Sequence, residues 1–160
     1  MSLIIEDGSI VLNANSYITV AEYEAWIDDR DLVHTGHNQV ETIEKHIRRA
    51  TDYFESLNLR GVKSTQNQSL QFPRYGLWID NYAVDSNEIP PVLKKALYEI
   101  TYADERGYGL LNTIARKTKR EKVGDLEIEY TDNSSSYITA PSVTAYVYKL
   151  IMPKNQIIKI

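Results

Sequence analysis

Residues 40–57 have the sequence VETIEKHIRRATDYFESL, and this stretch decides the fold class that we predict for the chain. Apolar side chains recur at steps of three or four residues, from Val40 through Ile43 and Ile47 onward. One face of a helix over this stretch is therefore apolar for about five turns, while charged residues fill the other faces. Gly61 follows, as is typical beyond a helix C-terminus. The stretch predicts a long amphipathic helix.

Three shorter helices are predicted around this one. Residues 19–30 begin with Thr19 and Glu22 at the spacing of a capping box, in which each side chain bonds the other residue's amide. Residues 89–106 begin with two prolines, which a first helical turn tolerates, and then carry an apolar stripe. The last helix, over residues 141–151, is short.

Residues 62–87 are predicted to form a long, polar, irregular loop that contains Pro73 and Gly76. A loop of this length in a compact domain is usually packed down by its own side chains. The apolar residues available for that packing are Leu70, Phe72, Leu77, Trp78 and Ile79.

Residues 116–131 predict a β-hairpin, because a Gly124-Asp125 pair separates two segments that fit a tight turn. After the turn, apolar and polar side chains alternate with the period of two that is typical of a half-buried strand. Residues 132–136 are predicted to be a flexible link, and residues 152–160 an extended tail.

We therefore expect a mainly α fold: a small bundle of three to four helices with a long packed loop, a C-terminal β-hairpin and an extended tail. Residues 1–131 form the helical part, including the hairpin, and residues 132–160 add the link, the short helix and the tail of the same single domain.

Composition excludes several classes of protein. The 160 residues are 42% hydrophobic and 25% charged, which is ordinary for a folded domain. The net charge of −4 argues against DNA binding by the whole surface. The chain has no cysteine, so disulfides, thiolate nucleophiles and cysteine-ligated metals are excluded. The longest apolar runs fall far short of the ~20 residues of a membrane span, and the N-terminus lacks the basic region of a secretory signal.

The strongest charge feature is the segment from Arg116 to Lys122, with five cations in seven residues. One interpretation is a patch that contacts nucleic-acid phosphates. The other is a structural ladder, because a two-residue turn sets Lys122 opposite Glu127 and Arg120 opposite Glu129. Such cross-strand pairs stabilise a hairpin by about 0.2–1 kcal/mol each and reduce the net positive field. We favour the ladder.

The sequence gives no sign of an active site or cofactor. His34, His37 and His46 have no further ligand at a recognisable metal-binding spacing and are predicted to be solvated. The acids near residues 28–31 are too close in sequence to converge from one helix. There is no glycine-rich phosphate loop, nucleophile elbow or dinucleotide fingerprint. We expect no enzymatic activity, no metal and no cofactor.

Four aromatic residues, Trp26, Phe72, Tyr75 and Trp78, raise the alternative of base stacking, since aromatic platforms bind single strands without sequence preference. Packing of these rings against their own domain explains the same pattern more simply. We therefore predict that they are packed.

Six segments, in this order and spacing, resemble one family: Glu6-Asp7-Gly8, Ala14-Asn15-Ser16-Tyr17, Arg48-Arg49-Ala50-Thr51-Asp52-Tyr53, Gln71-Phe72-Pro73-Arg74 with Gly76, Ile89-Pro90-Pro91 before Lys94-Lys95-Ala96, and Lys122-Val123-Gly124-Asp125. From Glu6 to about Tyr130 the chain resembles the head–tail connector (adaptor) proteins of tailed bacteriophages. That sequence family also carries the label of DnaT-like single-stranded-DNA-binding protein.

The resemblance to connectors implies a structural virion protein. Copies of the chain would form a ring beneath the portal, extend the DNA channel and join head to tail. The implied partners are other copies of the chain, the portal protein and tail-side neck proteins, with genomic double-stranded DNA passing without sequence-specific binding. The protein would reside at the head–tail junction of the virion, and in the host cytoplasm during assembly. Candidate interface or channel residues are Arg116, Lys117, Lys119, Arg120, Lys122, Ile157, Ile158 and Ile160.

The alternative from the same resemblance is a single-stranded-DNA-binding accessory protein of the DnaT-like kind. Its basic strand and loop aromatics would grip DNA, which requires an electropositive groove. At the level of sequence we favour the connector, because a net charge of −4 and glutamates opposite the cations fit such a groove poorly.

Overall fold

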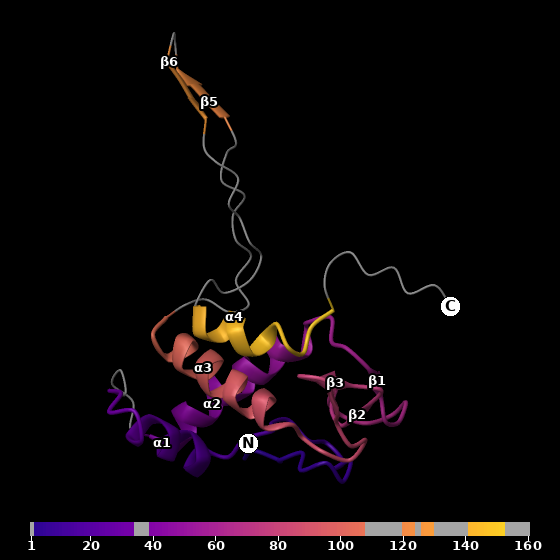
Figure 1. Ribbon diagram of the computed structural model, residues 1–160. Helices are drawn as coiled ribbons and strands as arrows, with labels where there is room; N and C mark the ends of the chain where they lie inside the picture. Colours follow the sequence, from indigo (N-terminus) through magenta and orange to yellow (C-terminus); the bar gives the residue numbers. More distant parts are fainter. Residues whose placement is uncertain (1, 34–38, 108–119, 124–125, 130–140, 153–160) are drawn as a thin grey trace.

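The computed structural model describes residues 2–33, 39–107, 120–123, 126–129 and 141–152, and for 120–123 and 126–129 it describes the backbone (Figure 1). The described helices are α1 (Val20–Asp28), α2 (Val40–Glu55), α3 (Pro91–Glu105) and α4 (Pro141–Val147). The described strands are β1 (Val62–Lys63), β2 (Arg74–Tyr75), β3 (Trp78–Ile79), β4 (Tyr82–Ala83), β5 (Arg120–Val123) and β6 (Leu126–Glu129).

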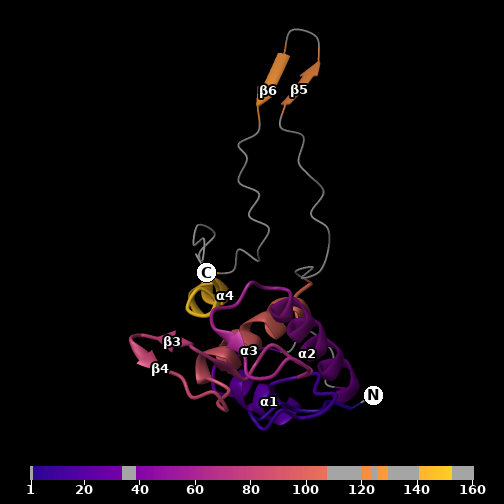
Figure 2. The ribbon, with the colours of Figure 1, turned by 90° about the vertical axis from the view of Figure 1, so that its right-hand side faces the viewer.

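The core lies where α2 and α3 pack side by side, with α1 against α2 and α4 against α3 (Figures 1 and 2). The apolar stripe predicted for α2 is buried from Ile43 to Phe54, as expected for an amphipathic helix. Val40 is the exception: it is exposed, because it occupies the first position of the helix. The predicted stripe of α3 is buried in full, from Leu93 to Ala103. The sequence pattern therefore predicted correctly which faces of α2 and α3 are buried.

The helix starts follow their local sequence signals. The side chain of Thr19 accepts a hydrogen bond from the amide of Glu22 at 3.1 Å, and Glu22 Oε2 accepts one from the amide of Thr19 at 2.8 Å. The predicted capping box is thus confirmed. Pro91 opens α3, where its missing N–H has no intrahelical role. Gly107, with φ of +81°, follows α3 in a backbone conformation that glycine adopts without strain.

The N-terminal segment before α1 is fixed by a buried carboxylate. Glu6 has no exposed surface, and its two oxygens accept hydrogen bonds of 2.8–3.0 Å from the amides of Gly8, Ile10 and Val11. Gly8 has φ of +106°, and a Cβ there would lie 1.9 Å from the carbonyl oxygen of Asn87. The carboxylate therefore accepts hydrogen bonds from three backbone amides that lie outside any helix or sheet and would otherwise need another acceptor.

The predicted mainly α bundle is wrong, because the fold is a small mixed α/β fold. The segment between α2 and α3, predicted as an irregular loop, forms two antiparallel ladders, β1 with β2 and β3 with β4. Each of these strands has two residues, too few to show a period of two in the sequence. The β3–β4 pair is closed by the two-residue turn at Asp80 and Asn81. Within this segment Leu70, Phe72 and Leu77 are buried, so their predicted packing is confirmed.

The predicted C-terminal hairpin is confirmed as a third antiparallel ladder, β5 with β6. Its register sets Lys122 opposite Glu127 and Arg120 opposite Glu129, as the two-residue turn predicted. Among the described residues, none of the helices has the length and apolarity needed to cross a membrane.

Candidate functional site

The buried guanidinium of Arg74 organises the segment between α2 and α3. Its Nε donates to the carbonyl of Arg60 at 2.6 Å, and its Nη2 donates to the carbonyls of Leu59 and Gly61 at 3.2 and 2.7 Å. Its Nη1 donates to the carbonyl and the side-chain oxygen of Gln71. Burial lowers the pKa of Arg74 from its ordinary value. The planar fork thus joins two chain segments that would otherwise leave buried carbonyls unpaired.

A second buried network ties the same segment to α2. The hydroxyl of Tyr17 donates to Oε1 of Glu55 at 2.6 Å and accepts from the amide of Phe72 at 2.9 Å. The amide of Gln71 donates to the other carboxylate oxygen at 2.7 Å. Burial raises the pKa of Tyr17. Burial also raises the pKa of Glu55, and this effect is larger than the lowering by the hydrogen bonds that its carboxylate accepts. All of these groups bond the protein's own backbone or one another, so their role is structural.

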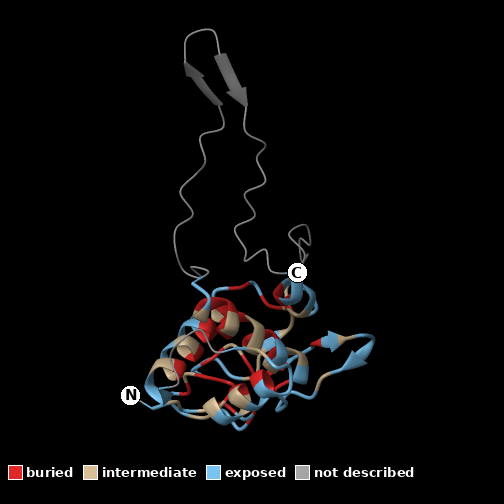
Figure 3. Ribbon diagram, turned by 90° about the vertical axis from the view of Figure 1, so that its left-hand side faces the viewer, coloured by how far each residue is buried: buried red, intermediate tan, exposed pale blue. Residues whose placement is uncertain are grey.

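Three exposed aromatic rings lie on the short ladders that these networks hold. Tyr75 on β2, Trp78 on β3 and Tyr82 on β4 have exposed fractions of 51%, 60% and 77%. They fall within one stretch of eight residues. Figure 3 shows β3 and β4 projecting from the body as an exposed hairpin. Large exposed rings gathered in this way are typical of a binding surface.

The register of β3 and β4 puts the two hairpin rings on opposite faces. Trp78 pairs with Ala83, and Ile79 pairs with Tyr82. Cross-strand partners share a face and successive residues alternate, so Trp78 and Ala83 share one face while Ile79 and Tyr82 share the other. The methyl group of Ala83 is too small to cover an indole. Trp78 itself is 60% exposed, so much of its ring is accessible to a flat partner.

The hairpin tip is a tight turn that contacts the C-terminal part of the chain. Asp80 and Asn81 have φ of +51° and +69°, the positive values that a type I′ hairpin turn requires at both central residues. Nζ of Lys149, just after α4, lies 2.6 Å from Oδ2 of Asp80. Both side chains are largely exposed, so this pair stabilises the hairpin by less than about 1 kcal/mol. The neighbouring Tyr148 is also exposed.

Several basic side chains of the described residues are paired with acids. Besides Lys149 with Asp80, the ion pairs include Arg48 with Glu44, Arg49 with Asp104, and Lys94 with Glu22. Pairing of this kind weakens the positive field that a phosphate backbone would meet. The aromatic rings, rather than a basic groove, are therefore the prominent feature of this surface.

The structure describes only part of the predicted interface set. Arg120 and Lys122 lie in β5 with the predicted register, while their side chains are not described. The remaining residues of that set lie outside the described residues: Arg116, Lys117, Lys119, Ile157, Ile158 and Ile160. Their proposed role in an interface stays a prediction.

The prediction that the four aromatic residues are packed is half right. Trp26 and Phe72 are buried, with exposed fractions of 7% and 0%. For Tyr75 and Trp78 the prediction is wrong, because both project from short ladders at the surface. Sequence reasoning also missed Tyr82. The sequence signal for Tyr82 is the Asp80-Asn81 pair before it, which is typical of a two-residue hairpin turn. In the structure that turn sets Tyr82 opposite Ile79.

The prediction of a solvated His46 is also wrong. Its Nδ1 lies 2.7 Å from Oδ2 of Asp104, whose other carboxylate oxygen lies 3.1 Å from Nη2 of Arg49. The Asp104 side chain is buried on α3, and His46 and Arg49 from α2 are the polar partners of its two carboxylate oxygens. His34 and His37 lie outside the described residues. Within the described part of the chain, no group of three or more His, Asp or Glu side chains could hold a metal ion.

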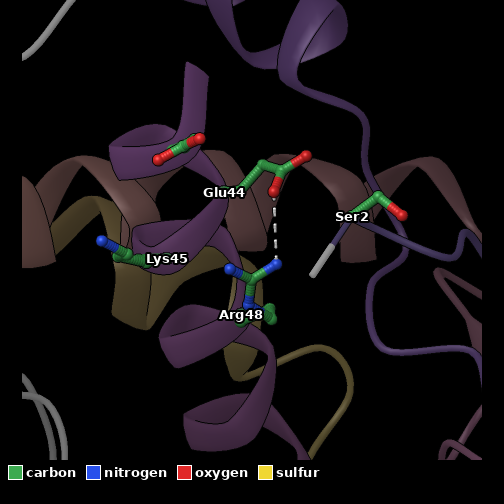
Figure 4. Close-up of a pocket in the computed structure, with 5 residues that line it drawn as sticks. Ser2, Glu44, Lys45 and Arg48 are labelled. Carbon is green, nitrogen blue, oxygen red and sulfur yellow. Dashed lines mark hydrogen bonds and ion pairs between the residues drawn. The ribbon is translucent and has the colours of Figure 1, made fainter. Parts of the chain in front are cut away.

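A shallow hollow beside α2 is lined by charged side chains of both signs (Figure 4). Nη1 of Arg48 and Oε2 of Glu44 are 3.4 Å apart within it. Ser2, Glu41 and Lys45 complete its lining. Arg48 and Glu44 pair with each other, and the residues that line the hollow do not form the apolar walls of a small-molecule site.

Comparison with known proteins identifies the family. The whole chain, residues 1–160, matches the protein family described as "Putative DnaT-like ssDNA binding protein". The chain therefore belongs to that family. Comparisons with curated proteins and with solved structures gave no match. The match supports the DnaT-like label of the resemblance, while the head–tail connector identity receives no support from it.

Proposed function

We propose that this protein binds single-stranded DNA by stacking bases on the exposed rings between α2 and α3. The observation that carries the proposal is the pair of rings on one projecting hairpin, Trp78 and Tyr82, which are 60% and 77% exposed. Bases of single strands stack on such rings whatever their sequence, with about 1–3 kcal/mol per base. Membership of a family described as single-stranded-DNA-binding supports the same function.

The charge balance sets the kind of binding that we expect. With a net charge of −4 and several cations in ion pairs, the protein attracts phosphates weakly. Stacking therefore supplies most of the binding free energy. We expect moderate affinity, little sequence preference and a weak dependence on salt, in contrast to proteins that neutralise many phosphates.

Fluorescence anisotropy of labelled oligonucleotides tests this proposal. Single- and double-stranded forms of one sequence are titrated with the protein at low and at physiological salt. We expect the single strand to bind more tightly than the duplex at both salt concentrations. Equal, salt-sensitive binding of both forms would point to non-specific electrostatic attraction and would contradict the proposal. The absence of single-strand binding would contradict it as well.

A second candidate is the structural one, a head–tail connector that forms a ring beneath the portal. The register of β5 and β6 favours it over DNA binding by the basic segment, because each of Arg120 and Lys122 has a glutamate opposite. A hairpin of two strands also offers edges that suit exchange between subunits. In this function the interface residues would be those of the hairpin and the C-terminal tail.

Mass measurement of the purified protein by light scattering tests the second candidate. A connector should form a closed oligomer, alone or with a portal protein, and removal of residues 152–160 should weaken assembly while cooperative melting remains. A chain that stays monomeric alone and with the portal would contradict this candidate. A truncated chain without a cooperative melting transition would also contradict it, since the tail would then serve folding.

A further inference from the structure

The β3–β4 hairpin carries one exposed ring on each face, and we propose that it is a wedge that separates two bases of a single strand, with one base on Trp78 and the other on Tyr82. This inference rests on the proposed function. It adds the conformation of the DNA strand that the site would bind and the reason why a duplex would not bind there.

The two faces of the hairpin differ in their relation to the body. The amide of Val84 donates to the carbonyl of Leu77 at 2.9 Å and so continues the ladder toward the core. Leu77 is buried, and Ile79 and Val84 are partly buried, so their shared face meets the domain. Tyr82 belongs to this face by alternation, yet it lies next to the turn and is 77% exposed. Trp78 lies on the outer face.

The thickness of the hairpin sets the spacing of the two bases. Packed sheets lie about 10 Å apart, which is roughly the thickness of one sheet with its side chains. Bases stacked in a helix are separated by about 3.4 Å. Two bases that lie against opposite faces of the hairpin therefore cannot be stacked on each other. A duplex offers no such pair, whereas a flexible single strand can pass around the turn.

The charges at the tip permit this passage. Asp80 is the acid in the turn, and Lys149 lies 2.6 Å from it, which offsets its repulsion of a phosphate. Lys149 is the cation that the structure places in contact with the tip. We therefore expect at most one phosphate contact at the tip, which gives a slope of log K against log salt no steeper than about −0.7 for a single strand.

The protein contains its own reporter for the wedge. It has two tryptophans, and Trp26 is buried between Tyr23 and Tyr98 while Trp78 is 60% exposed. Stacking of a base on Trp78 should quench its fluorescence. A 12-nucleotide oligothymidylate should thus quench part of the protein's emission, and the matching duplex should not. The quenching should be absent in Trp78→Phe, while the anisotropy affinity of that variant stays within about threefold.

The decisive experiment compares three single variants and one double variant by anisotropy with the same oligothymidylate. Trp78→Ala and Tyr82→Ala should each weaken binding about 10-fold, and the double variant about 100-fold, because each removes an independent base contact. Tyr148→Ala is the matched control, since it removes an exposed ring outside the hairpin and should leave affinity unchanged. All three residues are exposed, so thermal melting should be close to that of the wild type.

The outcomes separate the wedge from the proposed function. If Tyr82→Ala behaves as Tyr148→Ala does, or if the double variant is no weaker than Trp78→Ala, the two rings do not hold separate bases and the wedge is overturned. In that case single-strand binding by the wild type still supports the proposed function. If the wild type itself does not bind the oligothymidylate, the proposed function fails and the wedge fails with it.

Discussion

The hydroxyl of Tyr17 donates a hydrogen bond of 2.6 Å to the carboxylate of Glu55, which lies 38 residues away in the sequence. The same oxygen accepts the amide of Phe72 at 2.9 Å. One buried hydroxyl therefore joins the N-terminal segment, the last turn of α2 and the segment that presents the exposed rings. The candidate site depends on such buried polar contacts at a distance from it.

Replacement of Tyr17 by Phe should destabilise the fold by about 1–3 kcal/mol, because the amide of Phe72 and the carboxylate of Glu55 then lose a partner in a buried place. Urea unfolding monitored by circular dichroism measures the loss. Tyr82→Phe is the control, since Tyr82 is exposed and the change should stay within about 0.5 kcal/mol. Equal effects of the two substitutions would show that the buried network contributes little.

Replacement of Arg74 by Lys should be poorly tolerated, with a loss of about 3 kcal/mol or more, although the charge is kept. A lysine ammonium cannot reproduce the planar fork that now serves Leu59, Arg60 and Gly61 together. Arg106→Lys is the matched control at an exposed position. The same unfolding measurement applies, and a near-neutral Arg74→Lys would contradict the structural role assigned to the guanidinium.

Two glycine substitutions should separate steric clash from backbone strain. In Gly8→Ala the new Cβ would lie 1.9 Å from the carbonyl oxygen of Asn87, so we expect severe destabilisation or failure to fold. In Gly76→Ala, at φ of +71°, no neighbouring atom lies within 4 Å, so the cost should be about 1–2 kcal/mol from strain alone. Melting temperatures of the two variants give the comparison. Similar values would contradict the close approach at Gly8.

The ion pair of Glu22 with Lys94 predicts a pH dependence of stability. Burial raises the pKa of Glu22, but hydrogen bonds from Lys94 and from the amide of Thr19 outweigh it, and the pKa is lowered from 4.5. A carboxyl with a lowered folded pKa adds stability above its unfolded pKa and loses it as the pH falls through the folded value. Glu22→Gln keeps a capping side chain while it removes this charge.

We therefore expect Glu22→Gln to be less stable than the wild type at neutral pH, by less than about 1 kcal/mol because the pair is partly exposed. The difference should shrink as the pH falls through the lowered folded pKa of Glu22 and should be lost below it. Urea unfolding over that pH range tests the sign. Glu24→Gln on the same helix serves as the control, since it removes a charge outside this pair. A difference that grows toward low pH would contradict the assignment.

Four residues of the motifs that carry the family resemblance have structural roles. Glu6 and Gly8 shape the N-terminal segment, Tyr17 joins it to α2, and Arg74 organises the stretch before the exposed rings. A buried polar group without a partner is costly, so such residues are tightly specified by the fold. The candidate site itself uses residues outside those motifs, Trp78 and Tyr82. Resemblance therefore identified the scaffold more directly than the binding surface.

The sequence by itself determined the helices, the capping box at Thr19 and Glu22, and the register of β5 with β6, because these depend on periodicity and on contacts between near neighbours. Only the tertiary structure decided the mixed α/β character and the exposure of Trp78. Strands of two residues have no periodicity: β1 pairs with the more distant β2, while β3 pairs with β4 across the Asp80-Asn81 turn. The same ring type is buried at Trp26 and exposed at Trp78, because Trp26 packs against rings of α1 and α3 while Trp78 lies on a short hairpin beside the small Ala83.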